Sequence, residues 1–143
     1  MKMILITLFI TFLMANCQLE NSQDISPEMA KLEGKWKLSK VSYGFPPPNS
    51  PTEFKPIYEE ILEFNKGVFT RTKDSKVVET SSIKASIKND GGTVTREIII
   101  FEKNNMYSFY SFTENPVYLV LYQSTPIGAV LADGNSYFYE KVK

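Results

Sequence analysis

The side chains in this sequence that could do chemistry are carboxylates and phenols, because there is no histidine and Cys17 is the only cysteine. Zinc sites, Cys/His nucleophile pairs and disulfides therefore lack the residues they require, and we expect neither a metal nor another cofactor. The densest acidic group is Glu59, Glu60 and Glu63. On a strand, Glu59 and Glu63 share one face and Glu60 lies on the other, whereas a hydrolytic carboxylate pair has to converge on one bond. We interpret this group as part of a solvated strand and expect no enzymatic activity.

Aromatic residues are abundant, with 10 Phe and 8 Tyr in 143 residues. Tyrosines can line a ligand cavity while keeping a hydroxyl for polar contacts, although they are also ordinary strand residues. The tyrosines for which this cavity-lining role is considered are Tyr107, Tyr110, Tyr118, Tyr122, Tyr137 and Tyr139. The 16 Lys and Arg residues balance 16 Asp and Glu residues, so the chain has no net charge with which to collect a nucleic acid. The composition favours one aromatic-rich domain with no nucleic-acid partner.

The sole cysteine follows an apolar N-terminal segment. Residues 1–15 hold one charge, Lys2, and then an apolar run interrupted only by threonines. The run is shorter than the roughly 20 residues of a membrane span and is typical of an export signal. The five residues from Leu13 to Cys17 (LMANC) resemble the lipobox of bacterial lipoproteins, with Asn16 where Gly, Ala or Ser is usual.

The lipobox resemblance implies cleavage before Cys17 and acylation of that residue. We therefore predict a signal peptide over residues 1–16, and a lipidated cysteine with a flexible polar tether over 17–31. Several acyl chains give a durable membrane anchor where one holds only marginally. The residue after Cys17 is Gln18 rather than the aspartate that signals inner-membrane retention in some bacteria. We therefore expect the protein to be located in the cell envelope, at the outer membrane. Ser26 and Pro27 also suit the start of a short helical turn, which leaves the structure of the tether's end open.

The alternation of side chains from Leu32 to Tyr43 predicts the first strand of an all-β domain. Trp36 and Leu38 share one face, and Val41 and Tyr43 are out of phase with them, so we expect a β-bulge near Ser39 or Lys40. A proline-rich loop from Gly44 to Pro56 follows. It is interpreted as a stiff segment that crosses one end of a barrel, with a ligand role for the prolines as the alternative.

The rest of the chain predicts a meander. Short strands with turn signals between them favour a single antiparallel up-and-down barrel of about eight strands over residues 32–143. The predicted strands are 58–64, 68–73, 77–88, 94–102, 106–112, 117–123, 128–132 and 137–142.

The motif at the head of this domain resembles one in the lipocalin-like (calycin-type) domains of Gram-negative bacterial lipoproteins. Gly34 and Trp36 match the G-x-W motif, and the chain ends in a strand of the expected kind. The resemblance implies that Trp36 packs across the closed end of the barrel with Lys141 of the last strand beside it, in place of the usual arginine. The second signature, Thr-Asp-Tyr, is absent, because Thr113-Glu114-Asn115 stands in its place.

The sequence leaves three functions open, in order of preference. The first is a membrane-anchored carrier or sensor that holds a small hydrophobic or amphipathic ligand in the barrel. The second is an envelope interaction protein with a filled barrel, and the third is an enzyme with an unrecognised site. For the first, we expect Phe45 and Phe54 to hang over the mouth. The residues expected to line the interior below them are Phe64, Phe69, Phe109 and Tyr118.

Overall fold

The computed structural model describes residues 25–89, 94–131 and 133–143. The described part begins two residues before a short helix that starts at Pro27. The predicted signal peptide, Cys17 and most of the predicted tether lie outside the described residues, as do Asp90 to Gly92 of one predicted turn.

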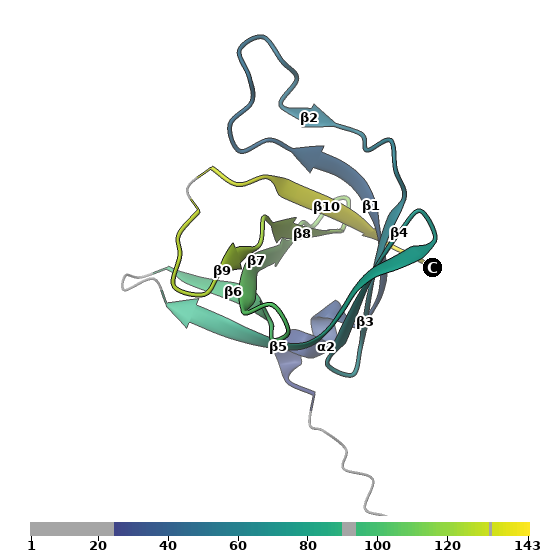
Figure 1. Ribbon diagram of the computed structural model, residues 1–143, viewed down its shortest axis with the longest axis vertical. Helices are drawn as coiled ribbons and strands as arrows, with labels where there is room; N and C mark the ends of the chain where they lie inside the picture. The colour runs from purple at the N-terminus through teal and green to yellow at the C-terminus, as the bar shows by residue number, and fades with distance from the viewer. Residues whose placement is uncertain (1–24, 90–93, 132) are drawn as a thin grey trace, which may run out of the picture.

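The chain forms a closed antiparallel β-barrel of eight strands, which confirms the predicted fold class (Figure 1). Neighbours in the sequence are neighbours in the barrel, and the last strand pairs with the first to close it. The barrel strands are β1 (Gly34–Ser42), β3 (Glu60–Asn65), β4 (Val68–Lys73), β5 (Lys76–Asn89), β6 (Thr95–Phe101), β7 (Met106–Phe112), β8 (Tyr118–Tyr122) and β10 (Ser136–Lys141). Two short strands lie outside the ring: β2 (Glu53–Phe54) pairs with β1, and β9 (Thr125–Pro126) pairs with β7.

Strand β1 contains the predicted bulge. Its register against β10 shifts between Leu38 and Lys40. The shift changes the phase of the strand, so Val41 is buried like Trp36 and Leu38, although it lies an odd number of residues from both. One bulge therefore lets both halves of β1 contribute to the same core.

A short helix, α2 (Pro27–Leu32), packs beside β5 at one end of the barrel (Figure 1). The Ser26 hydroxyl caps it by accepting a hydrogen bond from the Met29 amide, and Pro27 occupies the first turn, where no amide donor is needed. A six-residue helix has little stability alone, and α2 is held because Met29 and Leu32 are buried in the barrel core. Residues 27–31, which the sequence assigned to the flexible tether, thus belong to the folded domain.

The loop after β1 does not cross the barrel mouth, so that expectation is wrong. The chain continues β1 outward, reverses, and returns as β2, which pairs Phe54 with Val41 and Glu53 with Ser42. In Figure 1 this hairpin projects away from the ring of strands. The prediction missed β2 because two exposed residues carry no alternation signal. The strand predicted over 128–132 is also wrong, since residues 129–131 have no regular structure and β9 lies earlier.

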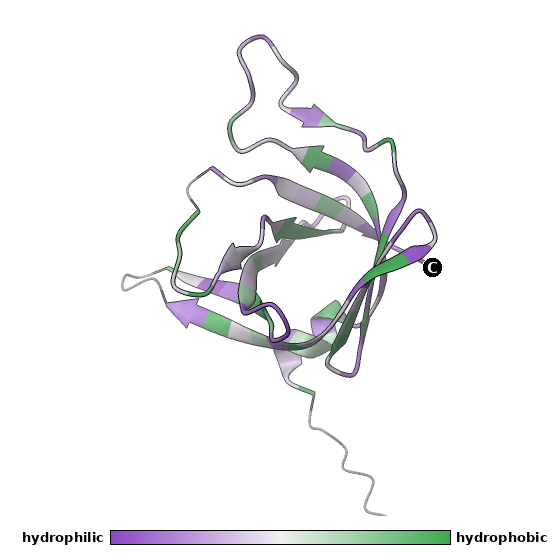
Figure 2. Cartoon of the chain, viewed as in Figure 1, coloured by the Kyte–Doolittle hydropathy of each residue, from purple (hydrophilic) through white to green (hydrophobic). Residues whose placement is uncertain are grey.

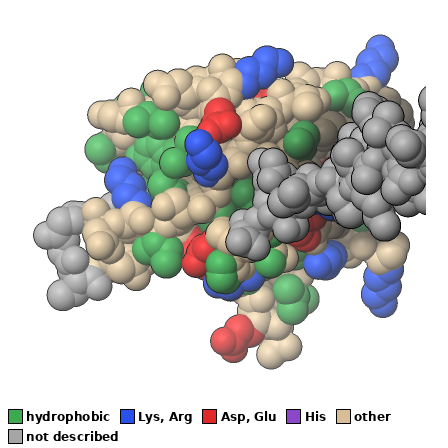
Figure 3. Space-filling view, turned by 90° about the horizontal axis from the view of Figure 1, so that it is seen from below, with side chains coloured by type: hydrophobic (Ala, Val, Ile, Leu, Met, Phe, Trp, Pro, Cys, Tyr) green, Lys and Arg blue, Asp and Glu red, His purple; other side chains and the backbone are tan. Residues whose placement is uncertain are grey.

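The outer face of the barrel carries cross-strand ion pairs. Lys35 pairs with Glu63 (3.5 Å) and Lys37 with Glu59 (2.6 Å), so those two carboxylates lie on the solvated side, as the strand phase indicated. Figure 2 shows hydrophilic and hydrophobic residues alternating along the strands. On the face shown in Figure 3, hydrophobic side chains are interspersed with charged ones. Among the described residues, no helix has the length and hydropathy needed to cross a membrane.

Candidate functional site

The end of the barrel opposite α2 contains a cavity of about 540 Å³. Its rim includes residues at strand ends and turns, such as Tyr58 before β3, Lys73 at the end of β4, Asn104 between β6 and β7, and Gln123 after β8. The volume falls within the range of about 300–1,000 Å³ that small-molecule sites occupy. The barrel is therefore filled near α2 and hollow at the other end.

The cavity has an apolar part. Leu62 and Phe69 come from β3 and β4, Phe101 from the end of β6, and Leu121 from β8. The Phe69 ring packs edge-on against Phe101, with the ring centroids 5.0 Å apart. These side chains offer a hydrocarbon surface where a ligand can be shielded from water.

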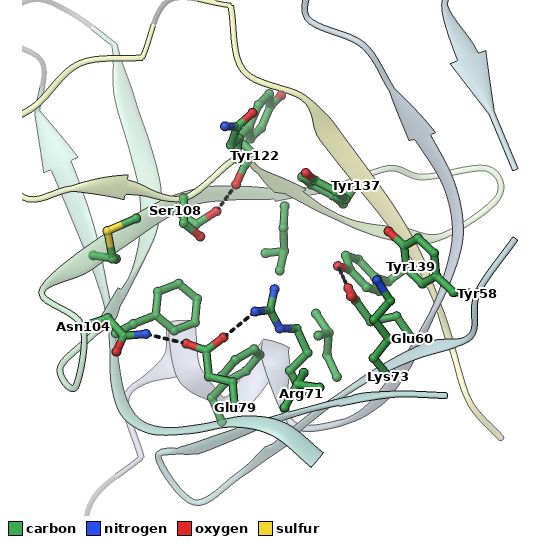
Figure 4. A pocket seen from close by; sticks show the side chains of 18 residues that line it. Tyr58, Glu60, Arg71, Lys73, Glu79, Asn104, Ser108, Tyr122, Tyr137 and Tyr139 are labelled. Atoms are coloured by element: carbon green, nitrogen blue, oxygen red, sulfur yellow. Dashed lines mark hydrogen bonds and ion pairs between the residues drawn. The ribbon is translucent and has the colours of Figure 1, made fainter. Parts of the chain in front are cut away.

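The wall formed by β4 and β5 is charged. Arg71 reaches from β4 into the cavity, and its Nη2 lies 3.0 Å from Oε2 of Glu79 on β5 (Figure 4). The other oxygen of Glu79 accepts a hydrogen bond of 2.8 Å from the Asn104 amide. Both oxygens of Glu79 are thus engaged by the protein. The Nε of Arg71 is buried and has no hydrogen-bond partner among the described residues.

A second polar cluster lies on the β3 and β10 side. Glu60 is buried, and its Oε1 accepts a hydrogen bond of 2.7 Å from the Tyr139 hydroxyl (Figure 4). Burial first, and then the Glu60 carboxylate, raise the pKa of Tyr139 well above its ordinary value of 10.0. The same two causes raise the pKa of Tyr58. Both phenols consequently keep their protons at neutral pH, and that of Tyr139 is donated to Glu60.

Lys73 lies beside this cluster and directly opposite Glu60 in the β3–β4 register. Its ammonium lies 3.8 Å from the centroid of the Tyr58 ring, a cation–π distance. Among the described residues, Lys73 forms no ion pair with a carboxylate. The cavity thus holds two carboxylates and two cations.

The predicted ligand-binding residues are not all brought together. Phe69 lines the cavity. Phe64 points inward but is packed below the cavity in the core, with its ring centroid 5.4 Å from that of Phe69. Phe45 and Phe54 lie on the projecting hairpin, where Phe45 is 80% exposed and Phe54 packs on Tyr43, and neither lines the cavity.

Phe109 and Tyr118 were expected to face inward, and this is wrong. On β7 the inward phase belongs to Met106 and Ser108, which line the cavity, so Phe109 lies on the outer face under the Arg96 guanidinium. Tyr118 lies on the outer face of β8, packed edge-on against Phe138. The error is a slip of one residue in strands that are aromatic on both faces.

The three residues assigned to barrel closure lie together at the α2 end. Trp36 is 2% exposed, and its indole Nε1 donates a hydrogen bond of 2.7 Å to the Leu32 carbonyl at the end of α2. Lys141 Nζ lies 5.2 Å from the centroid of the Trp36 ring. Gly34 has a φ of +115°, and a Cβ there would lie 3.4 Å from the Lys141 side chain, so a larger residue would be strained.

Comparison with known proteins gives no family assignment. No family model, no curated protein and no solved structure matches this chain. The barrel shape is shared by many unrelated functions, so function has to be argued from the cavity itself. Among the described residues there is also no group of three or more His, Cys, Asp or Glu side chains placed to hold a metal ion.

Sequence reasoning missed the polar residues that distinguish this cavity. The solvated-strand interpretation is wrong for Glu60, which is buried inside the barrel, and Arg71 and Glu79 were not singled out. A signal was present: Glu60 is in phase with Leu62 and Phe64 along β3, and Arg71 is in phase with Phe69 along β4. A charged residue in phase with apolar residues on a barrel strand indicates a polar group inside the barrel.

Proposed function

We propose that this protein is a lipid-anchored binding protein whose barrel holds one small amphipathic molecule in the cavity opposite α2. The observation that carries the proposal is the cavity itself, because a barrel with a purely structural role can be filled with side chains. An apolar part and a polar part in one cavity match a ligand with both kinds of surface. The acyl anchor on Cys17 rests on the lipobox resemblance alone, and it would hold the protein at the membrane.

Binding is favoured over catalysis by the way the charged groups are arranged. Glu79 forms an ion pair with Arg71 and accepts a hydrogen bond from Asn104, and Glu60 accepts a hydrogen bond from Tyr139. Each carboxylate is held by a neighbouring donor, an arrangement that fixes side-chain positions. A lipocalin-like carrier or sensor, as the G-x-W resemblance implies, is consistent with this arrangement.

The experiment is a calorimetric titration of the purified protein with decanol, an uncharged amphipathic probe. Val78 lines the cavity and is 53% exposed, so Val78→Trp narrows the cavity without overpacking the core. Val77 is its neighbour on β5, is also exposed and does not line the cavity, so Val77→Trp is the matched control.

We expect decanol to bind the wild type and the Val77→Trp variant, and to bind Val78→Trp at least about tenfold more weakly. Failure of the wild type to bind would favour the envelope interaction protein instead. Equal binding by both variants would place the probe elsewhere on the molecule.

A further inference from the structure

The hydrogen-bonding groups of the cavity are unequally used. One oxygen of Glu79 forms an ion pair with Arg71, its other oxygen accepts a hydrogen bond from Asn104, and one oxygen of Glu60 accepts a hydrogen bond from Tyr139. On the donor side, the buried Nε of Arg71 has no acceptor among the described residues, and the Lys73 ammonium contacts an aromatic ring rather than a carboxylate. Among the described residues, Lys73 is therefore the cation of this cavity that no carboxylate pairs with.

The Arg71 side chain is 43% exposed although its Nε is buried, so a ligand reaches the guanidinium through its exposed N–H groups rather than through Nε. The strongest partner for such a donor is an anionic oxygen, because charge-assisted hydrogen bonds are shorter and stronger than neutral ones. Figure 4 shows that Arg71 reaches toward the middle of the cavity, where a ligand can meet it. Lys73 projects from the same face of β4 two residues further along.

The positions along β4 also give the ligand a direction. Phe69, Arg71 and Lys73 follow one another from the α2 end toward the open end, and all three line the cavity. The apolar residues Leu62, Phe69, Phe101 and Leu121 are therefore available to a tail, while the cations lie nearer the rim. A head group at the rim and a tail below it leave the charged end partly hydrated.

A cationic head group fits less well. The tyrosines around Glu60 could surround an ammonium, but the Lys73 ammonium already lies on the Tyr58 ring. Glu60 itself is only 7% exposed and is held by Tyr139, so an incoming cation has little access to its carboxylate.

We propose that the ligand carries a carboxylate head group, which Arg71 binds through the exposed part of its guanidinium and Lys73 binds through its ammonium. This inference rests on the proposed function, since it names the class of ligand for the same cavity. The hydrocarbon part of the ligand lies against Leu62, Phe69, Phe101 and Leu121.

The test compares three probes of equal chain length: decanoate, decanol and decylamine. We expect the purified protein to bind decanoate at least about tenfold more tightly than decanol, as a charge-assisted contact provides, and to bind decylamine most weakly. The ratio of the decanoate and decanol affinities is the readout, because damage to the fold weakens both probes and leaves the ratio unchanged.

Two variants locate the head group. Lys73→Gln removes the ammonium, with Lys76→Gln as its control, because Lys76 pairs with Lys73 across the β4–β5 turn and does not line the cavity. The double variant Arg71→Gln, Glu79→Gln removes the guanidinium without changing the net charge. We expect the decanoate preference to fall in Lys73→Gln and in the double variant, and to persist in Lys76→Gln.

The outcomes separate this inference from the proposed function. Equal affinity for decanoate and decanol, tighter binding of decylamine, or a preference that survives both cavity variants would overturn the carboxylate assignment while leaving a binding cavity. Failure of all three probes to bind would remove the cavity function, and the head-group assignment with it.

Discussion

Replacing Trp36 with alanine tests how the closed end of the barrel is held. The indole is buried, packs against Phe112 with ring centroids 5.8 Å apart, and donates a hydrogen bond to the last residue of α2. Removing a buried Trp side chain costs about 3–5 kcal/mol, and the lost hydrogen bond leaves the Leu32 carbonyl without its partner. The loss is a large part of the roughly 5–15 kcal/mol that stabilises a domain.

At roughly 4 °C per kcal/mol for a domain of this size, we expect Trp36→Ala to lower the Tm by about 12–20 °C. Circular dichroism is the appropriate assay, because the variant has no tryptophan left to report by fluorescence. Trp36→Phe keeps most of the packing and loses the hydrogen bond, so its destabilisation should be smaller than that of the alanine variant. Phe45→Ala, at an aromatic side chain that is largely exposed, serves as the control and should change the stability by less than about 0.5 kcal/mol.

A measured loss below about 1 kcal/mol for Trp36→Ala would refute this reasoning, since a buried indole removed from a packed core costs more. It would mean that α2 and the barrel end are held without Trp36. The resemblance to the lipocalin G-x-W motif would then be superficial.

Three further predictions concern single residues. Tyr139→Phe should destabilise the protein by about 1.5–3 kcal/mol at neutral pH, because it removes the donor from the buried Glu60 carboxylate. Burial and Glu60 raise the folded-state pKa of Tyr139, so the stability that its hydroxyl contributes is present below the unfolded-state pKa of about 10 and is lost as the pH rises above it. Denaturant titrations from pH 8 to 11 should therefore show a shallower alkaline decline in the free energy of unfolding for Tyr139→Phe than for the wild type. Equal slopes would contradict the assignment. Gly44→Ala should destabilise the protein, because a Cβ at that position would lie 2.4 Å from the backbone oxygens of Asp133 and Gly134; an unchanged Tm would show that those two segments separate at little cost. Cys17→Ser should abolish incorporation of radiolabelled palmitate, and equal labelling of the mutant would end the lipoprotein interpretation.

The barrel could be predicted because its signals are local. The alternation of apolar and polar side chains predicted which residues of β1 point inward. The alternation reverses partway along the strand, which predicted the β-bulge that the structure has between Leu38 and Lys40. Turn residues between short runs marked most strand ends, and β4 and β7 have the predicted bounds. The sequence did not decide whether a helix forms at Pro27–Leu32, because α2 is stabilised by burial of Met29 and Leu32 and not by the helix propensity of its six residues.

The site was harder to predict because it depends on which face of each strand is inside. Phe109 and Tyr118 lie on strands that carry large apolar or aromatic side chains on both faces. Hydrophobicity alone therefore cannot predict which face of these strands points into the barrel. Arg71 and Glu79 are polar residues that the barrel encloses, and their pairing arises only when β4 and β5 come together. Phe45 and Phe54 were placed by assuming that a proline-rich loop crosses the mouth, whereas pairing of β2 with β1 directs it outward.

Native mass spectrometry of the protein purified without detergent tests the central claim most directly, namely that the barrel holds a small ligand. We predict a bound species in addition to any covalent acyl mass, which leaves when the protein is unfolded, persists in Val77→Trp and is lost in Val78→Trp. A mass equal to that of the covalent protein alone, together with no binding of added decanoate or decanol, would contradict the claim.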